Sequence, residues 1–465
     1  MIPDLHYLNL MKLAELLRTR AVSPVEVAHA QLDRIAELDG ALGSYALVTP
    51  EAALSAAKQA ESEIAAGNYR GPLHGVPIAV KDLCWTKGIA TAGGMAMYRD
   101  FIPAEDATVV ARLKEAGAVP LGKLTMTEGA YSDYHPSVKR PANPWNSAYW
   151  PGISSSGPAV ATAAGLCYGA IASDTGGSIR WPCGANGLTG IKPTWGRVSR
   201  FGVFELAASL DHVGPIARSA ADAGAVLGVI AGADKKDPTA VTEPVPDYLK
   251  AIGTRLQGMR IGIDPRWNSK DVDGAVQTVL ADAAEVLRTL GAELLEVSVP
   301  DVKQAVADWV PACAVEAAVA HENTFPSRRD EYGAVLASVL DTGNALPGRD
   351  LQKIQLRRMD LRGRFAHLLQ TIDLLLVPVH PFLPLSLASI RTLGEQAQLI
   401  LDLQRFTVPF DLVGNPAITL PGGFARSGLP IGFQLVARHL DEASLVRAGV
   451  AFQSATNWHE RYPIQ

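Results

Sequence analysis

The 465-residue sequence contains few cysteines and no long apolar run. Its four cysteines are scattered and form no CxxC pair, which argues against a zinc site and against a disulfide framework. No uncharged apolar stretch reaches the ~18 residues of a membrane span. The first twenty residues lack the apolar core and small-residue cleavage site of a signal peptide, and we expect an amphipathic helix there. The absences together predict a cytoplasmic protein with free thiols, without metal, cofactor or membrane anchor.

Charge is also scarce, and neither sign dominates. Charged residues make up 19% of the chain, and 42 basic against 47 acidic residues give a net charge of −5. A nucleic-acid partner would call for a basic face, so we expect none. Hydrophobic residues reach 48%, enough for a large core. At ~150 residues per domain the length would allow three domains, although large α/β enzymes often fold as one.

Helical and strand-like patterns alternate along the chain. Residues 1 to about 68 are predicted to be helical, and the short apolar run "GVPIAVKD" (75–82) is predicted to be a buried strand. A helix followed by a strand is expected at 106–123 and again at 282–299, with further strands at 373–379 and 417–424. This alternation predicts an α/β fold in which helices cover a largely parallel or mixed sheet.

The composition changes between residues 141 and 202, where Gly, Ser, Pro and Ala dominate. Such a stretch is expected to fold as tight turns and close backbone approaches around a small-residue helix at about 157–165. Rigid α/β scaffolds place their chemistry on loops of this kind. The functional site is therefore expected in this segment.

Within this segment, "ASDTGGSIRW" (172–181) offers two candidates for chemistry, Asp174 and Ser178. Asp-Thr-Gly is typical of pepsin-like proteases, in which two such aspartates share one proton, and a second copy begins at Asp341. That copy follows an apolar run with helical spacing, however, and the surrounding chain is Ala-rich rather than β-like. An aspartic protease that uses both aspartates is thus a remote alternative.

Ser178 needs a group that removes its proton. No histidine lies near it in sequence, although His212 could approach it in space, and the G-x-S-x-G elbow of α/β-hydrolases is absent. The chain offers instead a serine cluster at 154–156 and a lysine, Lys81, at the end of the predicted strand. A buried lysine can act as a base because desolvation disfavours its charged form.

Three motifs, "GVPIAVKD", "PGISSSGPAVATAAG" and "ASDTGGSIRWP", follow one another in an order that resembles the amidase signature family. The separations also agree, with 73 residues from Lys81 to Ser154 and 24 from Ser154 to Ser178. The resemblance extends over most of the chain and is weak only at about 230–370. It implies one domain with a large, mixed, mostly parallel central sheet and helices on both faces. Its parts would be a helical region at about 1–68, a core at about 70–220 and a second half at about 255–465.

The family resemblance also implies a catalytic triad. Ser178 would attack the amide carbonyl, Ser154 would relay its proton, and neutral Lys81 would receive one. In the family the bridging serine follows a cis peptide bond, so we predict a cis bond between Ile153 and Ser154. Backbone amides are expected to form the oxyanion hole, and other side chains to support the loop. The hole is assigned to Thr175, Gly176, Gly177 and Ser178, and the supporting side chains to Ser155, Asp174 and Arg180.

The family contains both free-standing amidases and the glutamine-hydrolysing component of a tRNA-dependent amidotransferase. We favour the first, because the Tyr-Asp-Gly-x-Arg segment of that component is not found here. The expected substrate is a small apolar, aryl or N-substituted amide, and a homodimer is expected only by analogy with the family. Substrate-pocket candidates come from segments that vary in the family. They are Met97, Tyr98, Tyr131, His135, Trp150, Ile153 and Phe204.

Overall fold

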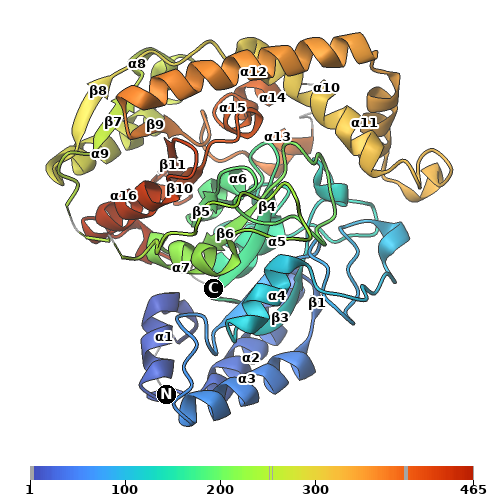
Figure 1. Ribbon diagram of the computed structural model, residues 1–465, viewed down its shortest axis with the longest axis vertical. Coiled ribbons are helices and arrows are strands. Elements are labelled where there is room, and N and C mark those ends of the chain that lie inside the picture. The colour runs from blue at the N-terminus through green and yellow to red at the C-terminus, as the bar shows by residue number, and fades with distance from the viewer. Residues whose placement is uncertain (1–4, 251, 254, 392–395, 464–465) are drawn as a thin grey trace.

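The computed structural model describes residues 5–250, 252–253, 255–391 and 396–463. Within these ranges one sheet of eleven strands runs through the molecule in the order β1-β3-β2-β4-β6-β5-β10-β11-β9-β7-β8 (Figure 1). The strands are β1 (Tyr45–Val48), β2 (Pro77–Lys81), β3 (Val119–Leu124), β4 (Gly169–Asp174), β5 (Thr189–Lys192), β6 (His212–Ala217), β7 (Arg260–Ile263), β8 (Glu293–Glu296), β9 (Leu374–Pro378), β10 (Ala417–Phe424) and β11 (Pro430–Ala437).

The sheet is mixed, as predicted, but it is not mostly parallel. Four neighbouring pairs are parallel, β2 with β3 and β4, and β7 with β8 and β9. The other six pairs, which include all those in the centre, are antiparallel. The prediction of a mostly parallel sheet is wrong because a helix does not separate every two strands. β10 and β11, for example, form a hairpin across residues 425–429.

Helices cover both faces of the sheet, as predicted. On β2, Ile78 and Val80 belong to one apolar cluster, whereas Ala79 between them belongs to another on the opposite face. The α-helices are α1 (Leu10–Arg18), α2 (Pro24–Leu42), α3 (Pro50–Ala65), α4 (Thr108–Glu115), α5 (Ser156–Ala163), α6 (Arg180–Asn186), α7 (Ala220–Ile230), α8 (Pro265–Ser269), α9 (Gly274–Thr289), α10 (Lys303–Ala320), α11 (Ala334–Ala345), α12 (Gly348–Thr371), α13 (Leu387–Arg391), α14 (Ala397–Gln404), α15 (Val408–Leu412) and α16 (Glu442–Ser454). Short 3-10 turns are η1 (Leu5–Tyr7), η2 (Ala96–Tyr98), η3 (Glu128–Ala130), η4 (Arg329–Glu331) and η6 (Trp458–Glu460).

The N-terminal part is not helical throughout. Between α2 and α3 the chain forms β1, which pairs antiparallel with β3 at one edge of the sheet. This four-residue strand is too short to carry a clear alternating pattern. Helix α2 shows the expected start, because Ser23 and Glu26 form a capping box ahead of Pro24. Figure 1 places α1 to α3 at the end of the molecule opposite α12.

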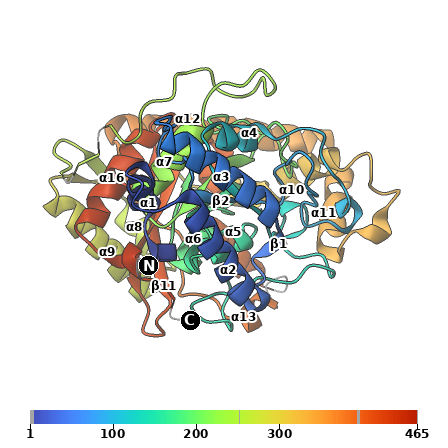
Figure 2. The same cartoon turned by 90° about the horizontal axis from the view of Figure 1, so that it is seen from below.

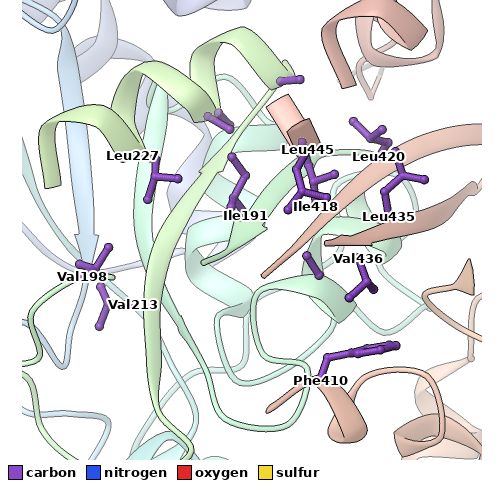
Figure 3. Packing of buried hydrophobic residues seen from close by; sticks show 14 of the residues in the cluster. Ile191, Val198, Val213, Leu227, Phe410, Ile418, Leu420, Leu435, Val436 and Leu445 are labelled. Atoms are coloured by element: carbon purple, nitrogen blue, oxygen red, sulfur yellow. The ribbon is translucent and has the colours of Figure 1, made fainter. Parts of the chain in front are cut away.

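The central strands β5, β6, β10 and β11 are buried along their whole length apart from Phe424 at the end of β10. In Figure 3, Leu445 of α16 lies close to Ile418 and Leu420 of β10 and to Leu435 of β11. Figures 1 and 2 agree that α9 and α16 lie on one side of the molecule and that α10 and α11 lie on the other. In the described ranges, no helix has the length and apolar character needed to cross a membrane.

Candidate active site

Lys81, the last residue of β2, is fully buried. Its Nζ lies 2.7 Å from Ser154 Oγ, 2.9 Å from Ser155 Oγ and 2.8 Å from Ser173 Oγ. All three partners are hydroxyls, which carry no charge to compensate an ammonium. Burial therefore lowers the pKa of Lys81 from 10.5 to about 7. The lysine can exist as a neutral amine near neutral pH.

Ser178 lies in the turn between β4 and α6, and 7% of its surface is exposed. Lys81 and Ser154 are both 0% exposed, so Ser178 is the member of the predicted triad that a solute can reach. Within the described part of the chain, no side chain hydrogen-bonds the Ser178 hydroxyl. The free hydroxyl is therefore available to a substrate.

The serine-rich segment packs against the start of α6, two residues after Ser178. A Cβ atom at Gly152 would lie 2.5 Å from Pro182 Cα, so only glycine fits there. Ile153 shares an apolar cluster with Trp181. The peptide bond between Ile153 and Ser154 is cis, as predicted.

The loop that carries Ser178 is held by its carbonyl groups. Each of the four carbonyls from residue 174 to residue 177 has a donor, and the donors come from different parts of the chain. They are His212 Nδ1 for Asp174 (3.2 Å), Trp309 Nε1 for Thr175 (2.8 Å), Thr407 Oγ1 for Gly176 (2.6 Å) and the Trp181 amide for Gly177 (2.7 Å). Because a trans peptide group points its N–H away from its carbonyl, these contacts also fix where the loop amides point.

Three of the four predicted oxyanion-hole amides are free. The amides of Thr175, Gly176 and Ser178 have no acceptor within the described residues. The Gly177 amide differs, because it donates to Asp174 Oδ1 at 2.7 Å. Its prediction as an oxyanion donor is therefore wrong for this conformation. The Asp174 carboxylate occupies that amide and holds the loop.

Asp174 and Arg180, expected to support this loop, form a buried ion pair. Arg180 donates to both oxygens of Asp174, at 2.9 and 3.0 Å, and also to Asp411 Oδ2 at 2.5 Å. Burial alone would raise the pKa of Asp174, but the Arg180 charge and backbone donors hold it well below its usual range. Asp174 is thus a permanently ionised structural anion.

The aspartic-protease alternative is excluded by the positions of the two aspartates. Asp341 lies on α11 at the surface and pairs with Arg329 at 2.6 Å. Asp174 is buried and paired with Arg180. The two carboxylates therefore have separate cationic partners and cannot share a proton, as the protease mechanism requires.

The pocket candidates occupy separate places. Trp150 and Ile153 are buried in the cluster that contains Trp181. Tyr98 and Phe204 lie 5.1 Å apart, ring to ring, in the wall of an open cavity. The remaining candidates lie elsewhere: Met97 packs on the main core, Tyr131 stacks on Trp309 at 6.4 Å, and His135 hydrogen-bonds Ser137 at 2.7 Å.

Sequence reasoning missed several residues around the site. Ser173, the residue before Asp174, contacts Lys81 directly. Trp309, Thr407 and Asp411 come from the second half of the chain, and no local motif marks them. In the described ranges, no three His, Cys, Asp or Glu side chains gather as a metal site would need.

Comparison with known proteins indicates the class of enzyme to which this chain belongs. The family model described as Amidase matches residues 26–446. The chain is 49% identical over 458 residues to "Putative amidase AmiD" of Mycobacterium tuberculosis, covering 98% of this chain and 96% of the relative. It is 37% identical over 478 residues to a glutamyl-tRNA(Gln) amidotransferase subunit of a Geobacter species, covering 97% of this chain and 98% of that one.

A solved structure is also similar. The peptide amidase of Stenotrophomonas maltophilia superposes with a TM-score of 0.83 at 28% identity, covering 98% of each chain. The chain therefore belongs to the amidase signature family. This membership supports its assignment as a hydrolase that acts on amides.

Proposed function

We propose that this protein hydrolyses a carboxylic amide, with Ser178 as nucleophile, Ser154 as proton relay and Lys81 as terminal base. The observation that carries the proposal is the environment of Lys81, a fully buried amine surrounded by hydroxyls. Such a lysine is neutral in a large fraction of molecules near pH 7, because its pKa is lowered to about 7. A neutral amine can accept a proton.

The hydrogen bonds around Lys81 allow proton transfer through Ser154. A neutral amine has two hydrogens and one lone pair, so only two of its three hydroxyl partners can accept from it. Ser155 uses its hydrogen on the Ser173 carbonyl at 3.1 Å and must therefore accept. The lone pair of Nζ is left to the hydroxyl of Ser154, at 2.7 Å, or of Ser173, at 2.8 Å, and the proposal assigns it to Ser154.

In the proposed first step, Ser178 Oγ forms a bond to the amide carbon. Its proton passes to Ser154 Oγ while the Ser154 proton moves to Lys81 Nζ. Collapse of the tetrahedral intermediate breaks the C–N bond, and the proton held by Lys81 returns through Ser154 to the leaving nitrogen. Water then attacks the acyl-enzyme by the same route and releases the carboxylic acid.

The charge of the tetrahedral oxygen would be met by the free amides of Thr175, Gly176 and Ser178. The carbonyl in each of these peptide groups belongs to the preceding residue and already accepts a hydrogen bond. The amides therefore need no reorganisation when the charge develops. Removal of one such donor typically raises the barrier by roughly 3–4 kcal/mol. The free amides thus support the proposed oxyanion hole.

We propose a small apolar, aryl or N-substituted amide as substrate and hydrolysis without a partner protein. The 49% identity to "Putative amidase AmiD" supports the amidase part of this proposal. The second candidate is glutamine hydrolysis within an amidotransferase complex, which the 37% identity to the Geobacter amidotransferase chain supports. Homodimerisation remains a separate proposal.

Labelling of the purified protein by a fluorophosphonate, followed by peptide mapping, tests the nucleophile. We expect one label on Ser178 and none in Ser178→Ala. The same preparation is then offered anilides, benzamides, aliphatic amides, ureides and glutamine. Faster turnover of an aryl amide than of glutamine supports the proposal, and turnover of glutamine alone, dependent on a partner protein, supports the amidotransferase.

A further inference from the structure

The side chain of Thr175, in the 174–178 loop, is bound by a buried carboxylate. Its Oγ1 donates to Asp211 Oδ1 at 2.6 Å. The other oxygen of Asp211 accepts from the Leu206 amide at 2.9 Å and from the Ala207 amide at 3.1 Å. One carboxylate thus joins the loop that carries the proposed nucleophile to the turn that precedes β6.

The pairing of β4 with β6 brings Thr175 and Asp211 together. Asp174, the last residue of β4, lies opposite His212, the first residue of β6, in an antiparallel pair. The same register, continued by one residue beyond the two strands, places Thr175 opposite Asp211. The contact therefore follows from the sheet that carries the loop.

The Thr175 amide lies between two fixed groups. It belongs to the peptide group whose carbonyl, that of Asp174, lies 3.2 Å from His212 Nδ1. It also precedes the side chain that Asp211 binds. Because a peptide group is planar and threonine is branched at Cβ, these two contacts leave the N–H little freedom to turn. This amide is one of the proposed oxyanion donors.

The turn that supplies Asp211 is itself anchored to two helices. The Ser209 amide in this turn donates to Glu316 Oε2 at 2.7 Å, and Glu316 lies on α10. The Ser209 carbonyl accepts from Arg358 Nη2 at 2.6 Å, and Arg358 lies on α12. The Asp211 carboxylate is therefore held on a braced support.

The surroundings of Asp211 suit a fixed acceptor better than a base. Burial raises its pKa to about 6, so the carboxylate is ionised in most molecules at pH 7. Both of its oxygens already accept hydrogen bonds, and only 7% of the residue is exposed. A hydrogen bond from a hydroxyl to an ionised acceptor is stronger than one between neutral groups. Asp211 can therefore hold the threonine firmly.

We infer that Asp211 is a positioning residue for the proposed oxyanion hole, which acts through the Thr175 hydroxyl to keep the Thr175 amide in place for the tetrahedral oxygen. Asp211 itself contacts no reacting atom. The inference rests on the proposed amide hydrolysis and adds to it how one oxyanion donor is held.

Two substitutions at position 175 test the inference. Thr175→Val has the same shape without the hydroxyl, whereas Thr175→Ser keeps the hydroxyl. We expect Thr175→Val to lower kcat about 10- to 100-fold at unchanged KM, less than the roughly 100- to 1,000-fold loss that removal of a whole oxyanion donor causes. Thr175→Ser should stay within about 3-fold of the wild-type kcat. Rates are divided by the concentration of sites that a fluorophosphonate titrates, so unfolded protein does not enter kcat.

A second change shows whether the effect runs through Asp211. Asp211→Asn keeps the size of the side chain and removes its charge, so kcat should fall about 3- to 30-fold in an otherwise wild-type chain. In Thr175→Val the hydroxyl is already gone, and adding Asp211→Asn should lower kcat by no more than about 2-fold. Such non-additivity is expected when both residues act through one contact.

Thr189→Val is the matched control. Thr189 is also buried, and its Oγ1 accepts from Gln453 Nε2 at 2.9 Å. It lies opposite Ala217, at the other end of β6 from the loop. This variant loses a buried, hydrogen-bonded hydroxyl of the same kind, and it should keep the wild-type kcat and KM.

The failure of each proposal is distinguishable. If Thr175→Val keeps the wild-type kcat, or if Thr175→Ser loses as much as Thr175→Val, the inference is wrong. The same conclusion follows if Asp211→Asn lowers kcat by equal factors with and without the Thr175 hydroxyl. If the wild-type protein neither labels at Ser178 nor hydrolyses any amide, the proposed function itself fails.

Discussion

The rate of amide hydrolysis should follow the protonation of Lys81. At pH 7 a lysine with the ordinary pKa of 10.5 is neutral in about one molecule in 3,000, whereas a pKa of about 7 makes about half neutral. Burial thus raises the population of the competent base by about three orders of magnitude. We expect kcat/KM to rise with pH through an inflection near 7 and then to level off.

Ser173→Asp is the change that moves this inflection. It places a carboxylate where a hydroxyl now lies 2.8 Å from Lys81 Nζ. An opposite charge this close raises the pKa of a lysine by about one to three pH units, which lowers the neutral fraction at pH 7 roughly 5- to 500-fold. The activity of Ser173→Asp should therefore drop at neutral pH and recover in alkaline buffer.

The assay is kcat/KM for one unactivated amide between pH 5.5 and 10. Ser173→Asn is the matched variant of the same shape without the charge, and it should keep the inflection near 7. Lys192→Met is a second control, because burial lowers the pKa of Lys192 to about 7 as well. Among the described residues, however, Lys192 Nζ donates only to the Pro193 carbonyl oxygen. Superimposable profiles for Ser173→Asp and Ser173→Asn, or the loss of the inflection in Lys192→Met, would refute the assignment of the base.

Three further outcomes are expected. Ser154→Ala should lower kcat by about two to four orders of magnitude, as loss of proton transfer does. Ser156→Ala should lose little activity. A larger loss of activity in Ser156→Ala than in Ser154→Ala would contradict the proton relay. Trp309→Phe keeps an aromatic ring and removes the donor to the Thr175 carbonyl, so kcat should fall about 2- to 10-fold at unchanged KM. A change in KM alone would assign Trp309 to substrate binding. Arg180→Met leaves two buried carboxylates without their cation and should cost about 3–5 kcal/mol in unfolding free energy. Arg288→Met, on the surface, should leave the melting temperature unchanged. Equal melting temperatures for the two variants would show that the buried ion pair is dispensable.

Much of the site could be predicted because its chemistry lies in short stretches with fixed order. Lys81, Ser154 and Ser178 each lie within a motif, and the strand that ends at Lys81 is evident from its apolar run. The structure places two of them in hydrogen-bond contact. The third, Ser178, lies two residues before α6, and the serine segment packs against the start of that helix.

The remainder depends on contacts between distant parts of the chain. No spacing rule brings Trp309 to a carbonyl 134 residues earlier, or Thr407 to one 231 residues earlier. The Gly177 amide was misassigned for a related reason, because a sequence shows which residues are glycines but not which acceptor each N–H will meet. The strand directions in the centre of the sheet likewise depend on pairing across the fold rather than on local pattern.

The loop of residues 174–178, which carries Ser178, has a consequence for synthesis of the protein. Its carbonyls are held by groups on both halves of the chain, and the last of these, Thr407, precedes α15. A nascent polypeptide that has emerged from the ribosome only as far as α12 already contains Lys81, Ser154 and Ser178, yet lacks the hydroxyl that orients the Gly176 peptide group. The same holds for a fragment that proteolysis releases by a cut between α12 and α15. A chain that ends between α12 and α15 therefore carries the proposed triad without the Thr407 hydroxyl that orients the Gly176 peptide group, and we expect it to be less active than the completed molecule.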